Sequence, residues 1–134
     1  MGNPSDGDRS KRFYWDEDDV HVVGVRSTAD ALRGHGWLPG ADRLDLIPDL
    51  YETEGTPLAD KQLHLHYFVG TCDWYVAELD GDRRIAFGYV NLGDDQNAEW
   101  GYMDLTEMRD IVVRDLLVVE RDLDWTPARA GDVL

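Results

Sequence analysis

The chain has 134 residues, 43% of them hydrophobic, with 28 acidic against 13 basic side chains and a formal net charge of −15. This length is typical of a single domain that buries a core without disulfides or a structural metal. One cysteine, Cys72, excludes an internal disulfide framework and a cysteine-based zinc site. No apolar run reaches the ~18–20 residues of a membrane span, and residues 1–19 contain no signal-peptide pattern, so we expect a cytoplasmic protein.

The acidity is spread along the chain. Residues 40–82 carry a net charge of −8 and residues 85–134 a net charge of −7. A surface of this sign repels nucleic acid and anionic membranes, which require clustered Lys and Arg, and attracts basic protein surfaces instead. The strong excess of Asp over Glu is also compatible with a salt-adapted or GC-rich source, in which the charge serves solubility alone.

Composition divides the chain into three parts. Residues 1–19 mix Gly, Pro, Ser and alternating charges, which indicates a disordered or partner-docking segment. Residues 20–126 are expected to form one α+β domain. Residues 127–134 are expected to be a frayed tail.

The first half of the domain contains a β-rich run followed by a short helix. Val20–Arg26 is rich in β-branched residues, and Ser27 is placed as the N-cap of a helix that Gly34 ends. The apolar run Leu44–Tyr51 is interrupted by Pro48, which prevents one continuous helix.

From residue 63 the hydrophobic period becomes two, which predicts strands. The expected strands are Leu63–Val69, Cys72–Leu79, Arg84–Leu92, Glu99–Met103 and Leu116–Trp125. Asp80-Gly81 is a hairpin signal, and Asp104 with Glu107 forms a capping box that begins a short helix. This order predicts an α+β fold, an antiparallel β-meander of about four to five strands with one or two short helices.

Five short motifs occur in order along the chain. They are Leu46–Glu54 (LIPDLYETE), Trp74–Gly81 (WYVAELDG), Phe87–Val90 (FGYV), Gly101–Met108 (GYMDLTEM) and Glu120–Leu123 (ERDL). Together they resemble an uncharacterised bacterial family of domains of unknown function that is common on phages, plasmids and other mobile elements. The match covers about residues 44–126. It implies a mobile-element setting, and the host cytoplasm if the chain is phage-encoded, but it supplies no catalytic residues. Residues 1–40 and the acidic loop before Trp100 depart from the family pattern.

His64 and His66 are the candidate metal ligands. Two residues apart on a strand, they would point to the same side, and Glu78 or Asp80 could supply a third ligand from the neighbouring strand. This pattern supports an alternative function, a small metal-dependent hydrolase. The other interpretation is that the two histidines line the polar face of a half-exposed strand.

Other catalytic patterns are weaker. A nuclease-like set of Asp49, Glu78 and Asp80 lacks the lysine that normally follows the second acid, and Cys72 lies beside Asp73, which would raise its pKa. The chain contains no serine in a G-x-S-x-G turn and no glycine-rich phosphate loop.

Six carboxylates are the candidate partner-binding residues. On a continuous strand Glu120, Asp122 and Asp124 would face one side at intervals of about 6.6 Å and form a negative ladder. Asp94, Asp95 and Glu99 in the preceding loop would extend it. Such a ladder could occupy a basic groove built for a nucleic-acid backbone, whereas the alternative interpretation is an ordinary solvated face.

Aromatic residues recur on neighbouring predicted strands. They are Trp74, Tyr75, Phe87, Tyr89, Trp100 and Tyr102. Without interleaved Arg or Lys they are expected to serve core and cross-strand packing rather than base stacking.

The sequence therefore favours a non-enzymatic acidic binding protein of a mobile element, without a cofactor. We expect it to inhibit a basic nucleic-acid-binding host protein of a defence system through a carboxylate-rich surface. A third hypothesis is an obligate component of a larger assembly that docks through the aromatic residues of its N-terminal segment.

Overall fold

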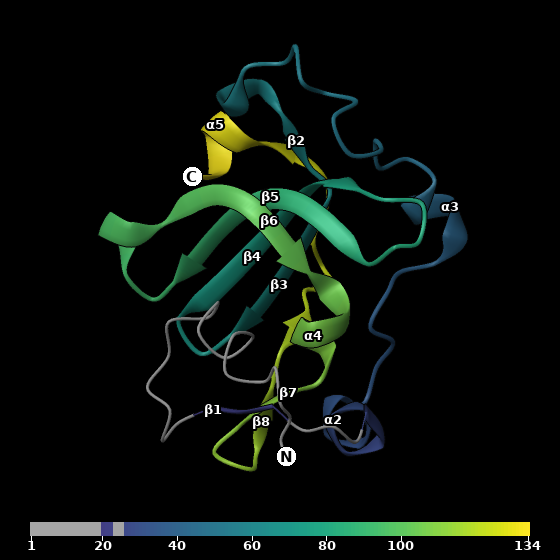
Figure 1. The fold of residues 1–134 in the computed structure, drawn as a ribbon, viewed down its shortest axis with the longest axis vertical. Coiled ribbons are helices and arrows are strands. Elements are labelled where there is room, and N and C mark those ends of the chain that lie inside the picture. The colour runs from purple at the N-terminus through teal and green to yellow at the C-terminus, as the bar shows by residue number, and fades with distance from the viewer. Residues whose placement is uncertain (1–19, 23–25) are drawn as a thin grey trace.

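The structure is a computed structural model and describes residues 20–22 and 26–134 (Figure 1). The predicted disordered or docking segment, residues 1–19, lies outside the described residues. The helices, all short, are α2 (Arg26–Arg33), α3 (Ala41–Leu44), η1 (Leu58–Asp60), η2 (Asp95–Asn97), α4 (Leu105–Arg109) and α5 (Ala130–Val133).

A five-stranded antiparallel sheet forms the centre of the molecule, with the strand order β6–β5–β4–β3–β9. Its strands are β3 (Leu65–Val69), β4 (Cys72–Leu79), β5 (Ile85–Leu92), β6 (Glu99–Asp104) and β9 (Glu120–Arg121). β3 to β6 follow one another as a meander, and β9 returns to the free side of β3. The predicted α+β fold is confirmed.

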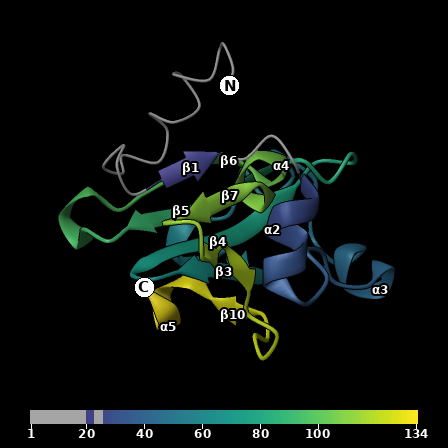
Figure 2. The ribbon, with the colours of Figure 1, turned by 90° about the horizontal axis from the view of Figure 1, so that it is seen from below.

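Two smaller sheets flank this meander. One joins β1 (Val20–Val22), β7 (Ile111–Val113) and β8 (Leu117–Val118), and the other pairs β2 (Gln62–Leu63) with β10 (Ala128–Arg129). Figure 2 shows α5 and β10 on one side of the molecule and α4 on the opposite side. The sheet is therefore partly covered on both faces.

The C-terminal residues differ from the prediction. Residues 127–134, expected to be a frayed tail, contain β10, which pairs with β2, and α5. Ala130 is buried and packs with Leu63 and Ala77. Because Ala130 is 67 residues from Leu63 and 53 residues from Ala77 in the sequence, local composition does not reveal this contact.

The last predicted strand, Leu116–Trp125, is also wrong as one continuous element. It is divided into β8 and β9 at Val119, which is completely buried. The Val119 carbonyl accepts a hydrogen bond of 2.8 Å from the buried Arg33 side chain of α2. The chain leaves the sheet again after Arg121.

Two local signals read from the sequence are confirmed. The Asp104 carboxylate accepts hydrogen bonds from the backbone N–H groups of Thr106 and Glu107, which begins α4 as the capping box predicts. Gly34, at φ +72°, follows α2 in the left-handed conformation that commonly ends a helix.

The main core lies on one face of the sheet. Tyr67 and Trp74, both buried, project from this face beneath the segment that carries Trp37. The Tyr67 hydroxyl donates a 2.8 Å hydrogen bond to the Trp37 carbonyl, and the two rings lie 4.4 Å apart. α4 completes this layer with Leu105 and Met108.

Aromatic side chains gather on the other face. Strand alternation places there a set that we call the aromatic face: Phe68, Tyr75, Phe87, Tyr89, Trp100 and Tyr102. α5 and β10 cover part of this face, and all six residues remain half-buried or exposed.

Candidate functional site

The aromatic face is a chain of ring contacts rather than a set of isolated residues. Phe87 lies 5.8 Å from Trp100 and 5.2 Å from Tyr102, and Trp100 meets Tyr89 edge-on at 5.7 Å. The predicted cross-strand packing role is therefore observed for these four rings. Trp74 is the exception among the predicted aromatics, because it is buried on the core face.

A buried ionic network lies beneath one end of this face. Glu78 is on β4 directly opposite Phe87, and its side chain is almost completely buried. It accepts hydrogen bonds from the backbone N–H groups of Tyr51 and Thr53, and from the Thr53 hydroxyl. The Nζ atom of Lys61 lies 3.8 Å from the same carboxylate.

The charged state of Glu78 is favoured by these contacts. Burial alone would raise the pKa of Glu78, but the hydrogen bonds from Thr53 and Tyr51 and the charge of Lys61 outweigh it. The net result is a pKa below the ordinary value. Glu78 is thus a buried, negatively charged carboxylate that anchors the loop carrying Tyr51.

Tyr51 occupies an unusual backbone conformation. Its φ of +71° is in the left-handed region, where a bulky residue is rarely found and costs roughly 1–3 kcal/mol. The hydrogen bond of 2.8 Å from its N–H group to Glu78 offsets part of this cost. Strain of this kind often occurs where a side chain is held in place for function.

The conformation of Tyr51 places its ring beside Tyr102. The two ring centres lie 6.3 Å apart at an angle of 55°, and the side chains are 61% and 55% exposed. A hydrogen bond between the two hydroxyl groups raises the pKa of Tyr102, and the negative charges of Glu78 and Glu54 act in the same direction. We call this feature the Tyr51–Tyr102 pair.

His66 is the centre of a second polar cluster on the same face. Its two ring nitrogens lie 2.9 Å from Asp122 and 2.7 Å from Asp73, and its ring stacks on Tyr75 at 4.6 Å. Trp125 closes the cluster at 5.3 Å from the histidine ring. These contacts join β3, β4 and the chain after β9.

The predicted histidine pair is not arranged as a metal site. His64 lies between β2 and β3, and burial, reinforced by the charge of Arg43, lowers the pKa of its ring. Both nitrogens of His66 face carboxylates. The suggested third ligands are engaged elsewhere, Glu78 with Lys61 and Asp80 with the backbone of the β4–β5 turn. In residues 20–22 and 26–134 no group of three or more His, Cys, Asp or Glu side chains is placed to hold a metal ion.

The predicted loop carboxylates lie together at the β5–β6 connection. Asp94 accepts hydrogen bonds from Gln96 and Asn97, and Asp95 accepts one from Asn91. These bonds shape the η2 turn and occupy part of each carboxylate. Glu99, at the start of β6, is exposed.

The other three predicted carboxylates do not form a ladder. Only Glu120 is in a strand, where it faces His35 at 3.4 Å. Asp122 turns to His66 and also accepts a bond from the N–H group of Asp124, which lies in an exposed turn. β9 and the β5–β6 loop lie at opposite edges of the sheet, so the six carboxylates form two groups.

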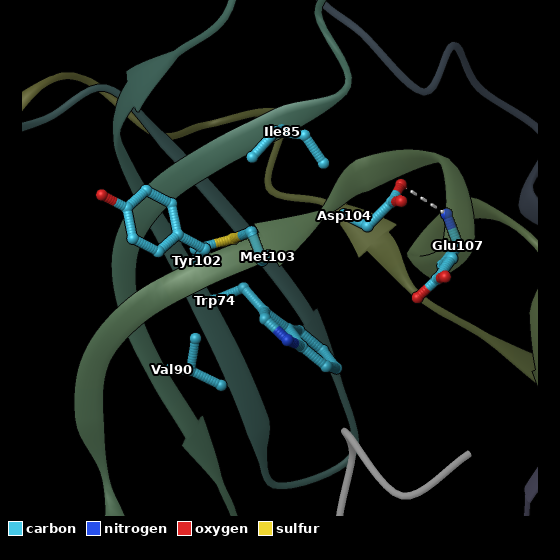
Figure 3. Close-up of a pocket in the computed structure, with 7 residues that line it drawn as sticks. All are labelled: Trp74, Ile85, Val90, Tyr102, Met103, Asp104 and Glu107. Carbon is cyan, nitrogen blue, oxygen red and sulfur yellow. Dashed lines mark hydrogen bonds between the residues drawn. The ribbon is translucent and has the colours of Figure 1, made fainter. Parts of the chain in front are cut away.

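A small cavity lies on the core face beside α4 (Figure 3). Its volume is about 110 Å³, below the ~300–1,000 Å³ of usual ligand pockets. Trp74, Ile85, Val90 and Met103 line it, and Asp104 at its rim is engaged in the cap of α4. Tyr102 also lines the cavity, and Figure 3 shows its ring directed away from the Trp74 indole.

The charges of the described residues are strongly unbalanced. Between residues 40 and 134 there are 21 carboxylate side chains and eight Lys or Arg side chains. Each of the eight cations already has a partner within the chain: Arg43, Lys61, Arg83, Arg84, Arg109, Arg114, Arg121 and Arg129. The carboxylates in this range therefore outnumber the cations by 13.

Sequence reasoning missed the Tyr51–Tyr102 pair and the role of Lys61. Tyr51 was assigned to an apolar run, and its left-handed conformation depends on Glu78, 27 residues later. One signal was present: Lys61 is the only lysine after Lys11, and it is surrounded by acidic sequence.

These features define a class, namely a small α+β protein with an antiparallel sheet, a half-exposed aromatic face and a surplus of carboxylates. The family model "Protein of unknown function (DUF2958)" matches residues 52–130, and the chain belongs to this family. The predicted resemblance to a family of domains of unknown function is thereby confirmed. No curated protein and no solved structure matches the chain. None of the helices in the described residues is both long and apolar enough to span a membrane.

The segments that carry the family resemblance converge in space. Four of them contribute to one place, through Tyr51, Glu78, Phe87 and Tyr102. The fifth contributes Asp122 to the His66 cluster. Three motifs inside the matched residues 52–130, and Tyr51 just before them, thus meet at one end of the aromatic face.

Proposed function

We propose that this chain is a non-enzymatic acidic binding protein that acts by engaging a basic partner protein. In the mobile-element setting, the partner is a host protein of a defence system whose basic surface binds nucleic acid, and engagement inhibits it. The location is the cytoplasm, which is that of the host cell if the chain is phage-encoded.

The observation that supports this proposal is the surplus of carboxylates whose counter-charges are absent from the chain. All eight cations in residues 40–134 are engaged internally, which leaves 13 negative charges in excess. A field of this sign accelerates encounter with basic proteins and repels phosphate backbones. A partner that presents Arg and Lys would supply the missing charge.

The aromatic face supports a protein rather than a small ion as the partner. Exposed Tyr and Trp side chains are enriched in protein interfaces because they contribute large contact area with little loss of conformational entropy. Mimicry of a nucleic-acid backbone would be a more specific form of this binding and requires evenly spaced carboxylates. Because β9 ends before Asp122 and Asp124, these two residues do not continue a regular strand spacing. Binding to a basic partner requires only the excess of carboxylates.

The test is affinity capture from the source cell at low and high salt, followed by competition. We expect a basic nucleic-acid-binding protein to be retained at low salt and released at high salt, since screening at ~1 M shortens the Debye length to about 3 Å. Adding the purified chain should then displace nucleic acid from the captured protein. Failure to retain any basic protein at low salt, or retention without displacement of nucleic acid, would contradict the proposal.

A further inference from the structure

One place on the aromatic face has the chemistry to receive a single cationic side chain. The rings of Tyr51 and Tyr102 are more than half exposed, and neither takes part in the core. Rings of this type attract cations through the negative charge of their faces, most strongly when the cation is partly desolvated.

The electrostatic surroundings of the pair favour a positive charge. The backbone N–H group of Glu54 donates a 3.1 Å hydrogen bond to the Tyr51 carbonyl, and the Glu78 carboxylate accepts one of 2.8 Å from the Tyr51 N–H group. Both acidic residues thus lie at the Tyr51 turn, and their negative charges contribute to raising the pKa of Tyr102. Lys61, the cation that pairs with Glu78, is buried and donates hydrogen bonds to Thr53. Its charge is therefore engaged inside the molecule, whereas the two rings are exposed to solvent.

The molecule already contains this type of contact on the inner side. The Nζ atom of Lys61 lies 5.9 Å from the centre of the Phe87 ring, and Phe87 itself contacts Tyr102 at 5.2 Å. The cluster of Phe87 and Tyr102 is thus already in contact with one ammonium group, that of the buried Lys61. A second cation arriving from solvent would meet the opposite, exposed end of that cluster.

The pair is also fixed before any partner arrives. The left-handed backbone of Tyr51 is held by its bond to Glu78, and Tyr102 is held in β6 opposite Phe87. Preorganised rings lose little entropy on binding, which increases the affinity of a contact for its given area.

We propose that the Tyr51–Tyr102 pair, with Glu54 beside it, is the contact site for an arginine side chain of the partner protein. Arginine fits better than lysine because its planar guanidinium stacks on aromatic rings while its N–H groups remain free to bond a carboxylate. This inference rests on the proposed function and adds to it the residue type that the partner must present.

The experiment uses the full chain and two synthetic probes, an arginine-rich peptide and its twin with lysine at every arginine position. Dissociation constants are measured by calorimetry at low salt for the wild-type chain and four variants: Tyr102→Ala, Tyr102→Phe, Glu54→Gln and Asp82→Asn. Circular dichroism of each variant checks that it is folded. Asp82, in the exposed β4–β5 turn, is the matched control for the loss of one charge.

We expect Tyr102→Ala to weaken binding of the arginine peptide by about three- to thirty-fold, the range for a cation over an aromatic ring. Tyr102→Phe, which keeps the ring, should bind nearly as the wild type does. Glu54→Gln should weaken binding more than Asp82→Asn. The arginine peptide should bind the wild type more tightly than the lysine peptide, and Tyr102→Ala should abolish that preference.

The possible failures are separable. If the wild-type chain binds neither peptide at low salt, the proposed function fails and this inference fails with it. If the wild type binds both peptides but Tyr102→Ala binds them unchanged, only the site is refuted. If binding depends on Tyr102 but is equal for both peptides, the assignment to arginine is refuted. If Tyr102→Ala is unfolded, the comparison of Glu54→Gln with Asp82→Asn decides, since equal effects would refute a local site.

Discussion

Replacement of Lys61 by methionine tests the buried network that anchors the Tyr51 loop. The Nζ atom of Lys61 donates hydrogen bonds of 2.5 and 2.7 Å to the backbone carbonyl and the hydroxyl group of Thr53. It lies 3.8 Å from the Glu78 carboxylate. The side chains of Lys61 and Glu78 are only 5% and 4% exposed. Methionine retains most of the stem but removes the charge, so the variant isolates the ionic contribution.

The expected loss of stability in Lys61→Met depends on the hydrogen-bond donors that remain around Glu78. Breaking one partner of a buried ion pair typically costs about 3–5 kcal/mol, because the other charge is left uncompensated. Here the carboxylate keeps three donors, two backbone N–H groups and the Thr53 hydroxyl. We therefore expect the lower end, about 3 kcal/mol, which for a domain of this size lowers Tm by roughly 10 °C.

The measurement is urea unfolding at neutral pH, followed by circular dichroism. Arg83→Met is the matched control, because the Arg83–Asp45 pair is exposed and an exposed pair is worth about 0–1 kcal/mol. The loss in Lys61→Met should shrink in acid as Glu78 becomes protonated, since a neutral carboxyl group no longer needs the ammonium. Equal losses in the two variants at neutral pH would refute the description of Lys61 and Glu78 as a buried, mutually dependent pair.

Two further predictions concern packing and pH. Gly88→Ala should cost at least about 3 kcal/mol in the free energy of unfolding or prevent folding, because its Cβ would lie 1.7 Å from the Tyr75 carbonyl oxygen. Gly101→Ala, where a Cβ meets open space, should change it by less than about 1 kcal/mol, and equal effects in the same urea assay would contradict the register of β4 and β5. Burial and the charge of Arg43 lower the pKa of His64. As the pH decreases below ~6.5, the unfolded chain therefore takes up the proton before the folded chain does, and the free energy of unfolding decreases. His64→Gln should flatten that decline between neutrality and about pH 5, and an unchanged slope would exclude His64 as its source.

Local signals in the sequence predicted the central sheet well. The period of two placed strands close to β3, β4, β5 and β6, and the Asp80-Gly81 signal placed the β4–β5 turn. There the Asp80 carboxylate accepts a bond from the N–H group of Arg84, and Arg83 takes a left-handed φ of +59°. These features were predictable because alternation, turn chemistry and helix caps depend on neighbouring residues.

Features that depend on distant residues were not predictable in this way. Val119 leaves the strand pattern because Arg33, 86 residues earlier, binds its carbonyl. Residues 127–134 are ordered because β10 finds an edge at β2. Neither partner can be identified from the composition of the segment concerned.

The candidate site shows the same division. Counting charges correctly identified an excess of carboxylates, but it did not show which of them are already engaged. Asp122 was expected to face a partner and instead contacts His66, whereas Glu54 was not singled out and lies beside exposed rings. Which carboxylates are engaged within the chain depends on hydrogen-bond geometry, and this geometry cannot be derived from the order of residues in the sequence.

The Tyr51–Tyr102 pair separates the two explanations of the negative charge. A coat of Asp and Glu that serves only solubility gains nothing from exposed aromatic rings, because such rings promote association. The exposed rings are explained if they contact a cationic partner, as proposed above, since the carboxylates then attract what the rings bind. The positive φ of Tyr51 does not by itself separate the two explanations, because Arg83, Arg114 and Asp115 share it. The exposed rings therefore bear on the proposed binding role more directly than the net charge, which solubility alone explains.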